Sequence, residues 1–189
     1  MNQWWQLWTK WLSEDDCKRI IESCKALPPV DGQIGHGGKA SLDSSWRRST
    51  IRWVPKLNPD FDILFKSIKF LFEEANANAF GFHLSEFREV QFTEYHETVK
   101  GSYAWHKDLA WTKPTPNHRK LSMVAQLSKP TDYEGGKLEL DVSECQEVPG
   151  PEMYEQGSII VFPSFLSHQV TPVTKGTRYS LVSWHEGPK

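Results

Sequence analysis

The sequence predicts a mainly β domain with flanking helices, because two different hydrophobic patterns follow one another along the chain. Residues 1–80 contain two stretches with apolar residues at helical spacing. From Phe87 onward, short strands recur at regular intervals and are separated by turns. Many short strands at such spacing are typical of a sandwich, a barrel or a jelly roll. With 189 residues, we expect a single domain over 1–189, with helical support from 1–80 and a β core over 87–187.

Two helices are expected in the N-terminal part. Ser13 can cap the first helix, and Asp16 is its partner in a capping box. Pro28-Pro29 follow the apolar positions of this helix and end it. The second helix is predicted to begin at Asn58-Pro59, because proline suits the first helical position, and to end at Gly81. Its wide apolar stripe predicts that it packs on an outer face of the sheet.

Composition limits the partners and the compartment. The net charge of −2 gives no electrostatic reason to expect nucleic acid or a membrane surface as a partner, and no stretch approaches the length of a membrane span. The N-terminus lacks both a basic start and a long apolar run, so we expect no signal peptide. Cys17, Cys24 and Cys145 form no Cys-x-x-Cys pair, which favours a reducing compartment and indicates no zinc cluster. Nothing in the composition indicates an oligomeric state.

Candidate metal ligands lie at the ends of predicted strands. His106 ends the strand Ser102–His106, and Asp108 follows two residues later. Residues i and i+2 of a strand share a face, so the two side chains should point the same way. His168 follows a second predicted strand, Ser158–Phe162. Two imidazoles and one carboxylate can occupy one face of an octahedral ion and leave the other face open, which is the arrangement of non-haem Fe(II) oxygenases.

A third predicted strand, Arg178–Trp184, favours an anionic cosubstrate beside that metal. The period of a strand places Arg178, Ser180, Val182 and Trp184 on one face. The planar guanidinium group of an arginine matches a carboxylate bidentately. A cation, a hydroxyl donor and a large ring would therefore share one cavity wall.

Two other interpretations of these residues stay open. His-x-Asp with a distant histidine could hold Zn²⁺ for hydrolysis with bound water as the nucleophile, but that leaves Arg178 and Ser180 without a function. A metal-free jelly-roll binding module would keep the shape alone. It predicts a damaged ligand set, whereas all three ligand types are present.

Several longer motifs make the chain resemble one family. They are Tyr95, Trp105-His106-Lys107-Asp108, Tyr133-Glu134-Gly135-Gly136-Lys137-Leu138, Gly157-Ser158-Ile159-Ile160-Val161-Phe162-Pro163-Ser164, His168-Gln169-Val170-Thr171-Pro172-Val173 and Gly176-Thr177-Arg178-Tyr179-Ser180-Leu181-Val182. With these motifs the chain resembles the 2-oxoglutarate- and Fe(II)-dependent dioxygenases of the prolyl-4-hydroxylase-like group, which includes the phage and bacterial PKHD-type hydroxylases. The resemblance is strong over residues 87–187 and implies a cupin-like jelly roll, the double-stranded β-helix.

The resemblance also implies roles for the site residues. Fe(II) is held by the three candidate ligands, which together with Arg178 form the catalytic set. Arg178 binds the distal carboxylate of 2-oxoglutarate, with Ser180 and Tyr95 beside it and Trp184 on the same wall. Many prolyl hydroxylases carry a Tyr-Leu-Asn run where this chain has Gln126, so Gln126 stands where a tyrosine would contact the cosubstrate.

The activity implied is hydroxylation of a substrate C–H bond, coupled to conversion of 2-oxoglutarate and O2 to succinate and CO2. Ascorbate is a candidate additional cofactor, and the cytoplasm of a bacterium or a phage-infected cell is the expected location. The expected substrate is a prolyl residue in a peptide or protein, and the alternative is a free amino acid or another small molecule.

Three features favour a peptide substrate. The glycine-rich segment from Asp31 to Ser45 is expected to be a mobile loop that orders over a bound chain. The loop from Leu109 to His118 follows the ligands directly and should flank the mouth of the site. Trp105, Trp111 and Trp184 offer aromatic surfaces that suit proline-rich peptides, although Trp105 is equally suited to packing within the jelly roll.

Overall fold

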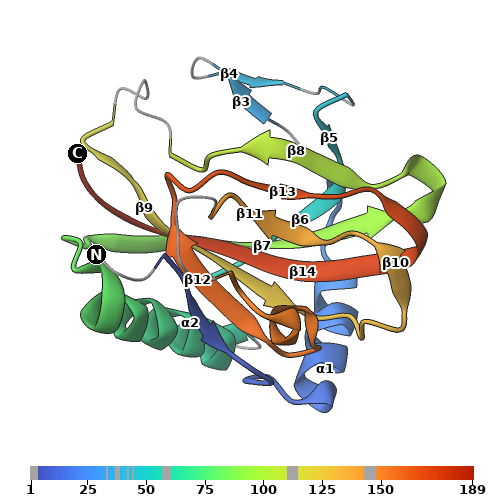
Figure 1. Ribbon diagram of the computed structural model, residues 1–189, viewed down its shortest axis with the longest axis horizontal. Helices are drawn as coiled ribbons and strands as arrows, with labels where there is room; N and C mark the ends of the chain where they lie inside the picture. The colour runs from blue at the N-terminus through green and yellow to red at the C-terminus, as the bar shows by residue number, and fades with distance from the viewer. Residues whose placement is uncertain are drawn as a thin grey trace.

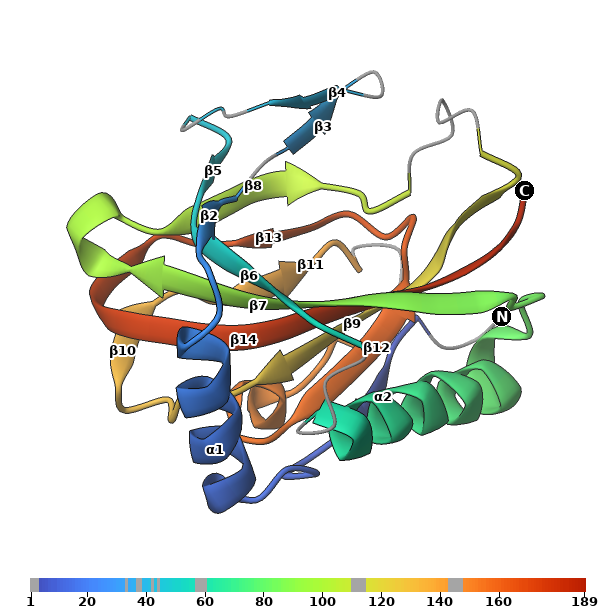
Figure 2. The same cartoon turned by 180° about the vertical axis from the view of Figure 1, so that it is seen from behind.

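In the part of the chain that the structure describes, an eight-stranded sheet, the larger sheet, faces a four-stranded sheet, the smaller sheet. Both helices cover the outer side of the larger sheet (Figure 1). The computed structural model describes residues 4–32, 34–36, 39–41, 43, 45–56, 61–109, 115–142 and 148–189. Seen from behind, the order of layers is the same, and the β3–β4 hairpin lies beyond the smaller sheet, on the side away from the helices (Figure 2).

The larger sheet runs in the order β1 (Gln6–Trp8), β12 (Ile159–Pro163), β9 (Asn117–Gln126), β14 (Val173–Pro188), β7 (Glu86–His96), β6 (Thr50–Val54) and β2 (Val30–Asp31), and β10 (Tyr133–Gly135) also pairs with β14. The smaller sheet runs in the order β11 (Leu138–Leu140), β13 (His168–Val170), β8 (Ser102–His106) and β5 (Arg47–Arg48). The hairpin consists of β3 (Ile34–His36) and β4 (Lys39–Ser41). Strands β8, β9, β11, β12, β13 and β14 alternate between the smaller and the larger sheet, which produces the predicted double-stranded β-helix.

The larger sheet separates two hydrophobic cores. On β9, Leu121, Met123 and Ala125 pack in the core beneath the helices, where Phe72 of α2 (Asp62–Ala75) is also buried. Val124 points to the opposite face and belongs to the core between the two sheets. Because burial of apolar area is the main favourable contribution to folding, this period-two pattern fixes which face of β9 can carry polar site residues.

The helices begin and end largely as the sequence predicts. Helix α1 (Glu14–Lys25) has the expected capping box, in which Ser13 and Asp16 bond each other's backbone N–H groups. Helix α2 (Asp62–Ala75) continues into a π-helical turn, η2 (Asn76–Phe80), and Gly81 ends it in the left-handed region at φ +66°. The predicted start at Asn58-Pro59 lies outside the described residues. Among the residues that the structure describes, no helix is both long and apolar enough to span a bilayer.

The segment from Asp31 to Ser45 was predicted to be a mobile loop. The structure instead shows the β3–β4 hairpin within it. Glycine composition indicated a turn-rich segment but gave no sign of the strand pairing. Gly32 connects β2 to the hairpin and donates its N–H to the carbonyl oxygen of Ser49 at 2.8 Å. A Cβ at Gly32 would lie 2.6 Å from Nε of Arg47 and 3.0 Å from the carbonyl oxygen of Ser49, so a larger residue would require these neighbours to shift. Gly32 is therefore packed against Arg47 of β5 and against Ser49, which connects β5 to β6.

Candidate active site

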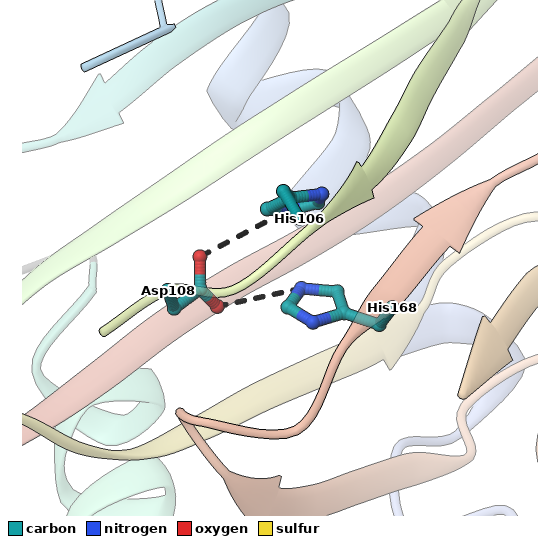
Figure 3. A group of neighbouring side chains, drawn as sticks. All are labelled: His106, Asp108 and His168. Atoms are coloured by element: carbon teal, nitrogen blue, oxygen red, sulfur yellow. Dashed lines mark ion pairs between the residues drawn. The ribbon is translucent and has the colours of Figure 1, made fainter. Parts of the chain in front are cut away.

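The three candidate metal ligands converge at one end of the space between the sheets (Figure 3). His106 is the last residue of β8, and the antiparallel register places it directly opposite His168, the first residue of β13. Asp108 lies just beyond the end of β8. Its Oδ1 is 3.8 Å from Nε2 of His106, and its Oδ2 is 3.5 Å from Nε2 of His168. One ligand atom from each residue lies within 4.8 Å of the others, which is close enough for one shared ion.

Both imidazoles turn Nε2 toward Asp108. Nδ1 of His106 lies 2.8 Å from the carbonyl oxygen of Ala104, and Nδ1 of His168 lies 3.0 Å from that of Leu166. A carbonyl oxygen only accepts, so each Nδ1 carries a proton, and in a neutral imidazole with this tautomer Nε2 keeps its lone pair. Burial, followed by the neighbouring His168, lowers the pKa of His106 to about 4. His106 is therefore neutral near pH 7, as a metal ligand must be.

The third ligand supplies a negative charge. Burial by itself would raise the pKa of Asp108, but His168, His106 and Arg119 outweigh it and hold this pKa well below its usual range. The side chain of Asp108 is only 8% exposed and is nevertheless ionised. Two neutral nitrogens and one carboxylate therefore form a donor set suited to a divalent cation such as Fe(II).

An aromatic and cationic stack supports His106. The ring of Tyr103 lies parallel to the imidazole, with centroids 3.5 Å apart and planes 16° apart. The guanidinium carbon of Arg47 lies 4.6 Å from the centroid of Tyr103 on β8. Burial raises the pKa of Tyr103 to about 12, so its ring stays neutral. The stack restricts the orientation of the imidazole, and the sequence patterns did not identify either residue as part of the site.

A cavity of about 440 Å³ joins the triad to the inner face of β14. Arg178, Ser180, Val182 and Trp184 all line it, as the strand period predicts. Tyr95 of β7 lines it as well, with its ring 5.4 Å from the guanidinium carbon of Arg178. The three candidate metal ligands and Arg178 therefore line the same cavity.

Arg178 is the centre of a cluster of buried donors. Its side chain is 1% exposed, and Nη2 donates to Oε1 of Gln126 at 2.8 Å. Within the described part of the chain, Nε and Nη1 of Arg178, Nε2 of Gln126 and Oγ of Ser180 have no hydrogen-bond partner. Leaving a buried polar group unpaired costs about 1–3 kcal/mol, and more if it is charged. The cluster consists of N–H and O–H donors, so an anionic acceptor such as a carboxylate fits it.

The opposite end of the cavity has an arginine stacked on a tryptophan. The guanidinium carbon of Arg119 lies 3.6 Å from the ring centroid of Trp184, and Nη1 lies 4.0 Å from Oδ1 of Asp108. Strict alternation along β9 would turn Arg119 toward the helices together with Leu121. The register shift between Arg119 and Leu121 brings the arginine to the cavity face instead. This is why the sequence patterns missed Arg119.

The other tryptophans that were predicted near the site differ in their positions. Trp105 is 43% exposed and is not among the described residues that line the cavity, because it points away from the face shared by His106. Trp111 lies outside the described residues. Trp53, which was not predicted, lines the cavity with 44% of its surface exposed, and its ring centroid is 6.4 Å from that of Trp184.

Comparison with known proteins agrees with this arrangement. The model of the 2OG-Fe(II) oxygenase superfamily matches residues 90–186. A PKHD-type hydroxylase of Synechococcus sp. strain CC9605 is 36% identical over 170 residues, which cover 87% of this chain and 69% of that protein. One of Prochlorococcus marinus is 36% identical over 99 residues, which cover 51% and 42%. The chain spans less than half the length of several of the relatives that it matches, for example 27% of a PKHD-type hydroxylase from a second Synechococcus strain, JA-3-3Ab.

Solved structures share the fold. A prolyl-4-hydroxylase of Pseudomonas putida superimposes with a TM-score of 0.71 at 20% identity, covering 98% of this chain and 93% of that one. A prolyl hydroxylase of Trichoplax adhaerens, in complex with a hypoxia inducible factor peptide fragment, gives a TM-score of 0.74 at 17% identity, covering 96% and 82%. These likenesses concern the jelly roll, whereas the family model matches half of the sequence itself. The chain therefore belongs to the 2OG-Fe(II) oxygenase superfamily.

Proposed function

We propose that this protein is a 2-oxoglutarate- and Fe(II)-dependent dioxygenase that hydroxylates a C–H bond of its substrate and converts 2-oxoglutarate and O2 to succinate and CO2. His106, Asp108 and His168 hold the iron. Arg178, with Ser180, Gln126 and Tyr95 around it, binds the distal carboxylate of 2-oxoglutarate. The observation that carries the proposal is the cluster of unpartnered donors around Arg178, which opens into the same cavity as the triad.

The donor set fits Fe(II), because among the described residues it offers two imidazoles and one carboxylate within reach of one ion, which would leave coordination positions open for reactants. Fe(II), when bound, supplies the redox chemistry that activates O2. The protein contributes the remaining parts of catalysis. The backbone carbonyls hold both imidazoles in the tautomer that binds metal, and the cavity provides space for reactants beside the triad.

The end of the cavity at Arg178 selects the cosubstrate. A dicarboxylate can place one carboxylate near the triad and the other against Arg178, and its charge neutralises the buried guanidinium group. The zinc hydrolase interpretation gives this donor cluster no ligand. A non-catalytic module does not need the tautomers and the low Asp108 pKa that favour metal binding.

An anaerobic titration tests the proposal directly. Fe(II) added to the protein together with 2-oxoglutarate should produce the weak visible charge-transfer band of an iron–2-oxoglutarate chelate. Zn²⁺ with 2-oxoglutarate should give no such band, and neither should Fe(II) with succinate, which lacks the keto group. A protein that binds Fe(II) without developing the band would contradict the assignment.

The substrate is proposed to be a prolyl residue in a peptide or protein. Trp184 offers an aromatic ring beside the triad, and the Arg119 guanidinium group stacked on it can donate to a peptide carbonyl. A second cavity of about 520 Å³ shares Asp31 and Arg47 with the first, and Thr50 and Thr98 line it farther out. That space can hold residues on either side of the one being hydroxylated. The names of the prolyl hydroxylase neighbours support the same class.

A side-by-side assay separates the two substrate classes. Proline-containing peptides and free amino acids are offered with Fe(II) and 2-oxoglutarate, and products are read by mass spectrometry. A one-oxygen mass gain on the peptides supports the proposal, and a gain confined to free amino acids supports the alternative. Deleting residues 33–42, which contain both strands of the β3–β4 hairpin, should impair peptide turnover if this segment closes over a bound chain.

We also propose a reducing location such as the cytoplasm of a bacterium or a phage-infected cell. Cys17 and Cys24 are free and buried, and burial raises their pKa to about 11 and about 12. Neither thiol is therefore suited to exchange or oxidation at neutral pH. Cys145 lies outside the described residues. Fractionation of cells expressing a tagged chain would test the location.

A further inference from the structure

Asp108 is anchored on a different sheet from the two histidines. His106 and His168 belong to strands of the smaller sheet. The backbone N–H groups of Asp108 and Leu109 instead donate to the carbonyl oxygen of Ser164, at 2.9 and 3.1 Å. Ser164 directly follows β12 of the larger sheet, and its own N–H donates to the carbonyl oxygen of Lys120 on β9 at 2.9 Å. The triad is therefore assembled across the two facing sheets.

Two buried hydroxyl groups extend this anchor to the carboxylate itself. Oγ of Ser122 donates to Oδ2 of Asp108 at 2.7 Å and lies 2.9 Å from Oγ of Ser164. A hydroxyl has one proton, and an ionised carboxylate only accepts. Ser122 therefore donates its proton to Asp108, so Ser164 must be the donor in the hydrogen bond between the two serine hydroxyl groups. The result is a directed relay from Ser164 through Ser122 to Asp108, with both serines fully buried.

We propose that Ser122 and Ser164 are positioning residues that fix the Asp108 carboxylate and thereby raise the affinity of the triad for its metal. The inference rests on the proposed function, because it assumes that the triad holds a metal. Without the relay, Oδ2 of Asp108 would lose the hydroxyl donor that lies 2.7 Å from it. Hydrogen bonds to charged groups contribute about 1.5–3 kcal/mol, so the relay is strong enough to define one orientation.

Ser122 lies on the face of β9 that is turned toward the cavity, at the end nearer to the metal ligands. Ser122, Val124 and Gln126 share the cavity face of this strand, and each lies opposite a residue of the cavity face of β14. Ser122 contacts the metal end, and Gln126 contacts Arg178 at the cosubstrate end. One strand face thus positions both ends of the cavity, so the effect of Ser122 on metal binding should be separable from cosubstrate binding.

The test measures metal affinity without turnover. Ser122→Ala should weaken anaerobic Fe(II) binding, measured by titration calorimetry, by about 10- to 100-fold, the usual effect of losing a hydrogen bond to a metal ligand. Ser164→Ala should weaken it less, because Ser122 can still donate to Asp108. Ser122→Thr keeps the hydroxyl group and should restore most of the affinity. The visible spectrum of bound Co(II) should change in Ser122→Ala and recover in Ser122→Thr.

Ser183→Ala is the matched control. Ser183 is also fully buried, and its hydroxyl group donates to the carbonyl oxygen of Glu89 at 2.6 Å, away from the triad. Ser183→Ala also loses one buried serine hydrogen bond, in this case to a neutral carbonyl oxygen, and should keep wild-type metal affinity. The inference is overturned if Ser122→Ala keeps wild-type affinity, or if Ser183→Ala loses as much as Ser122→Ala. Failure of the wild-type protein to bind Fe(II) at all would instead count against the proposed function.

Discussion

Arg178 and Gln126 form a hydrogen-bonded pair across two neighbouring strands of the larger sheet, with Nη2 of the arginine donating to Oε1 of the glutamine at 2.8 Å. The amide oxygen of Gln126 is thus occupied by the guanidinium group. Its amide nitrogen remains a buried donor, beside the free N–H groups of Arg178 and the hydroxyl group of Ser180. Gln126 therefore orients the arginine, and under the proposed function its amide nitrogen is a further donor for the carboxylate of 2-oxoglutarate.

Replacing Gln126 by glutamate should therefore block the cosubstrate. Gln126→Glu keeps the size of the side chain but adds a carboxylate that pairs with Arg178 and removes the amide donor. We expect the melting temperature to rise and 2-oxoglutarate affinity to fall by about 10- to 100-fold, taking about 1.5–3 kcal/mol for a charged hydrogen bond. Titration calorimetry measures the affinity. Gln156→Glu, whose amide contacts the carbonyl oxygen of Leu127, is the control and should leave that affinity unchanged.

Removing the arginine itself should have a larger effect. Arg178→Ala takes away the charge that compensates the distal carboxylate of 2-oxoglutarate, which corresponds to roughly 3–5 kcal/mol for one side of a buried charge pair. At about 1.4 kcal/mol per tenfold, cosubstrate affinity should fall by more than about 100-fold, while Fe(II) affinity is spared. Arg19→Ala, an exposed arginine on α1, serves as the control. An unchanged cosubstrate affinity in Arg178→Ala would refute the role.

Loss of the carboxylate ligand should abolish turnover. Asp108→Ala removes one of three protein ligands and the only charged one, so Fe(II) binding should weaken strongly. The fold should survive, because Asp108 follows the end of β8 and faces the cavity. Circular dichroism checks the fold, and calorimetry checks the metal. Asp15→Ala, on the exposed first turn of α1, should behave like the wild-type protein. A fully active Asp108→Ala enzyme would rule out the metal assignment.

Metal exchange separates oxygenase from hydrolase chemistry. EDTA should stop product formation, and added Fe(II) should restore it. Zn²⁺ can occupy the same ligands but cannot change oxidation state, so it should compete with Fe(II) and restore nothing. The measurement is succinate formation after metal removal and reconstitution. Recovery with zinc alone would favour the hydrolase interpretation.

Gly136 should be required for packing around the arginine. It has φ +57°, and a Cβ there would lie 2.8 Å from Cγ2 of Val173 and 3.2 Å from Cδ of Arg178. Gly136→Ala should lower stability by more than the 1–2 kcal/mol or so that a left-handed residue costs, and should also weaken 2-oxoglutarate binding. Gly81→Ala is the matched control, because Gly81 has φ +66° and nothing within 4 Å of a Cβ. It should show the backbone cost alone. Denaturant unfolding of both variants compares these costs, and equal losses of stability would contradict the packing argument.

The local part of the structure could be predicted from the sequence, because it depends on short-range periodicity. The capping box of α1 depends on two residues three positions apart, Ser13 and Asp16. The strand period of two was sufficient to place Arg178 and Trp184 on one face of β14, and that face does line the cavity. Asp108 also lies near His106, as predicted, although it follows the end of β8 and is held by a backbone hydrogen bond to Ser164 rather than by the strand period. The assignment of metal-ligating roles to these residues stays a prediction.

Contacts between distant segments could be decided only by the tertiary structure. The hydroxyl groups of Ser122 and Ser164 are 42 positions apart, and they reach Asp108 because β9 and β12 are neighbours in the larger sheet. Arg119 faces the cavity because a register shift overrides the alternation of β9. The sequence by itself determined which side chains each strand presents together. Strand order and register decided which of those faces meet, because long-range pairing depends on the packing of the whole sheet and leaves no local pattern.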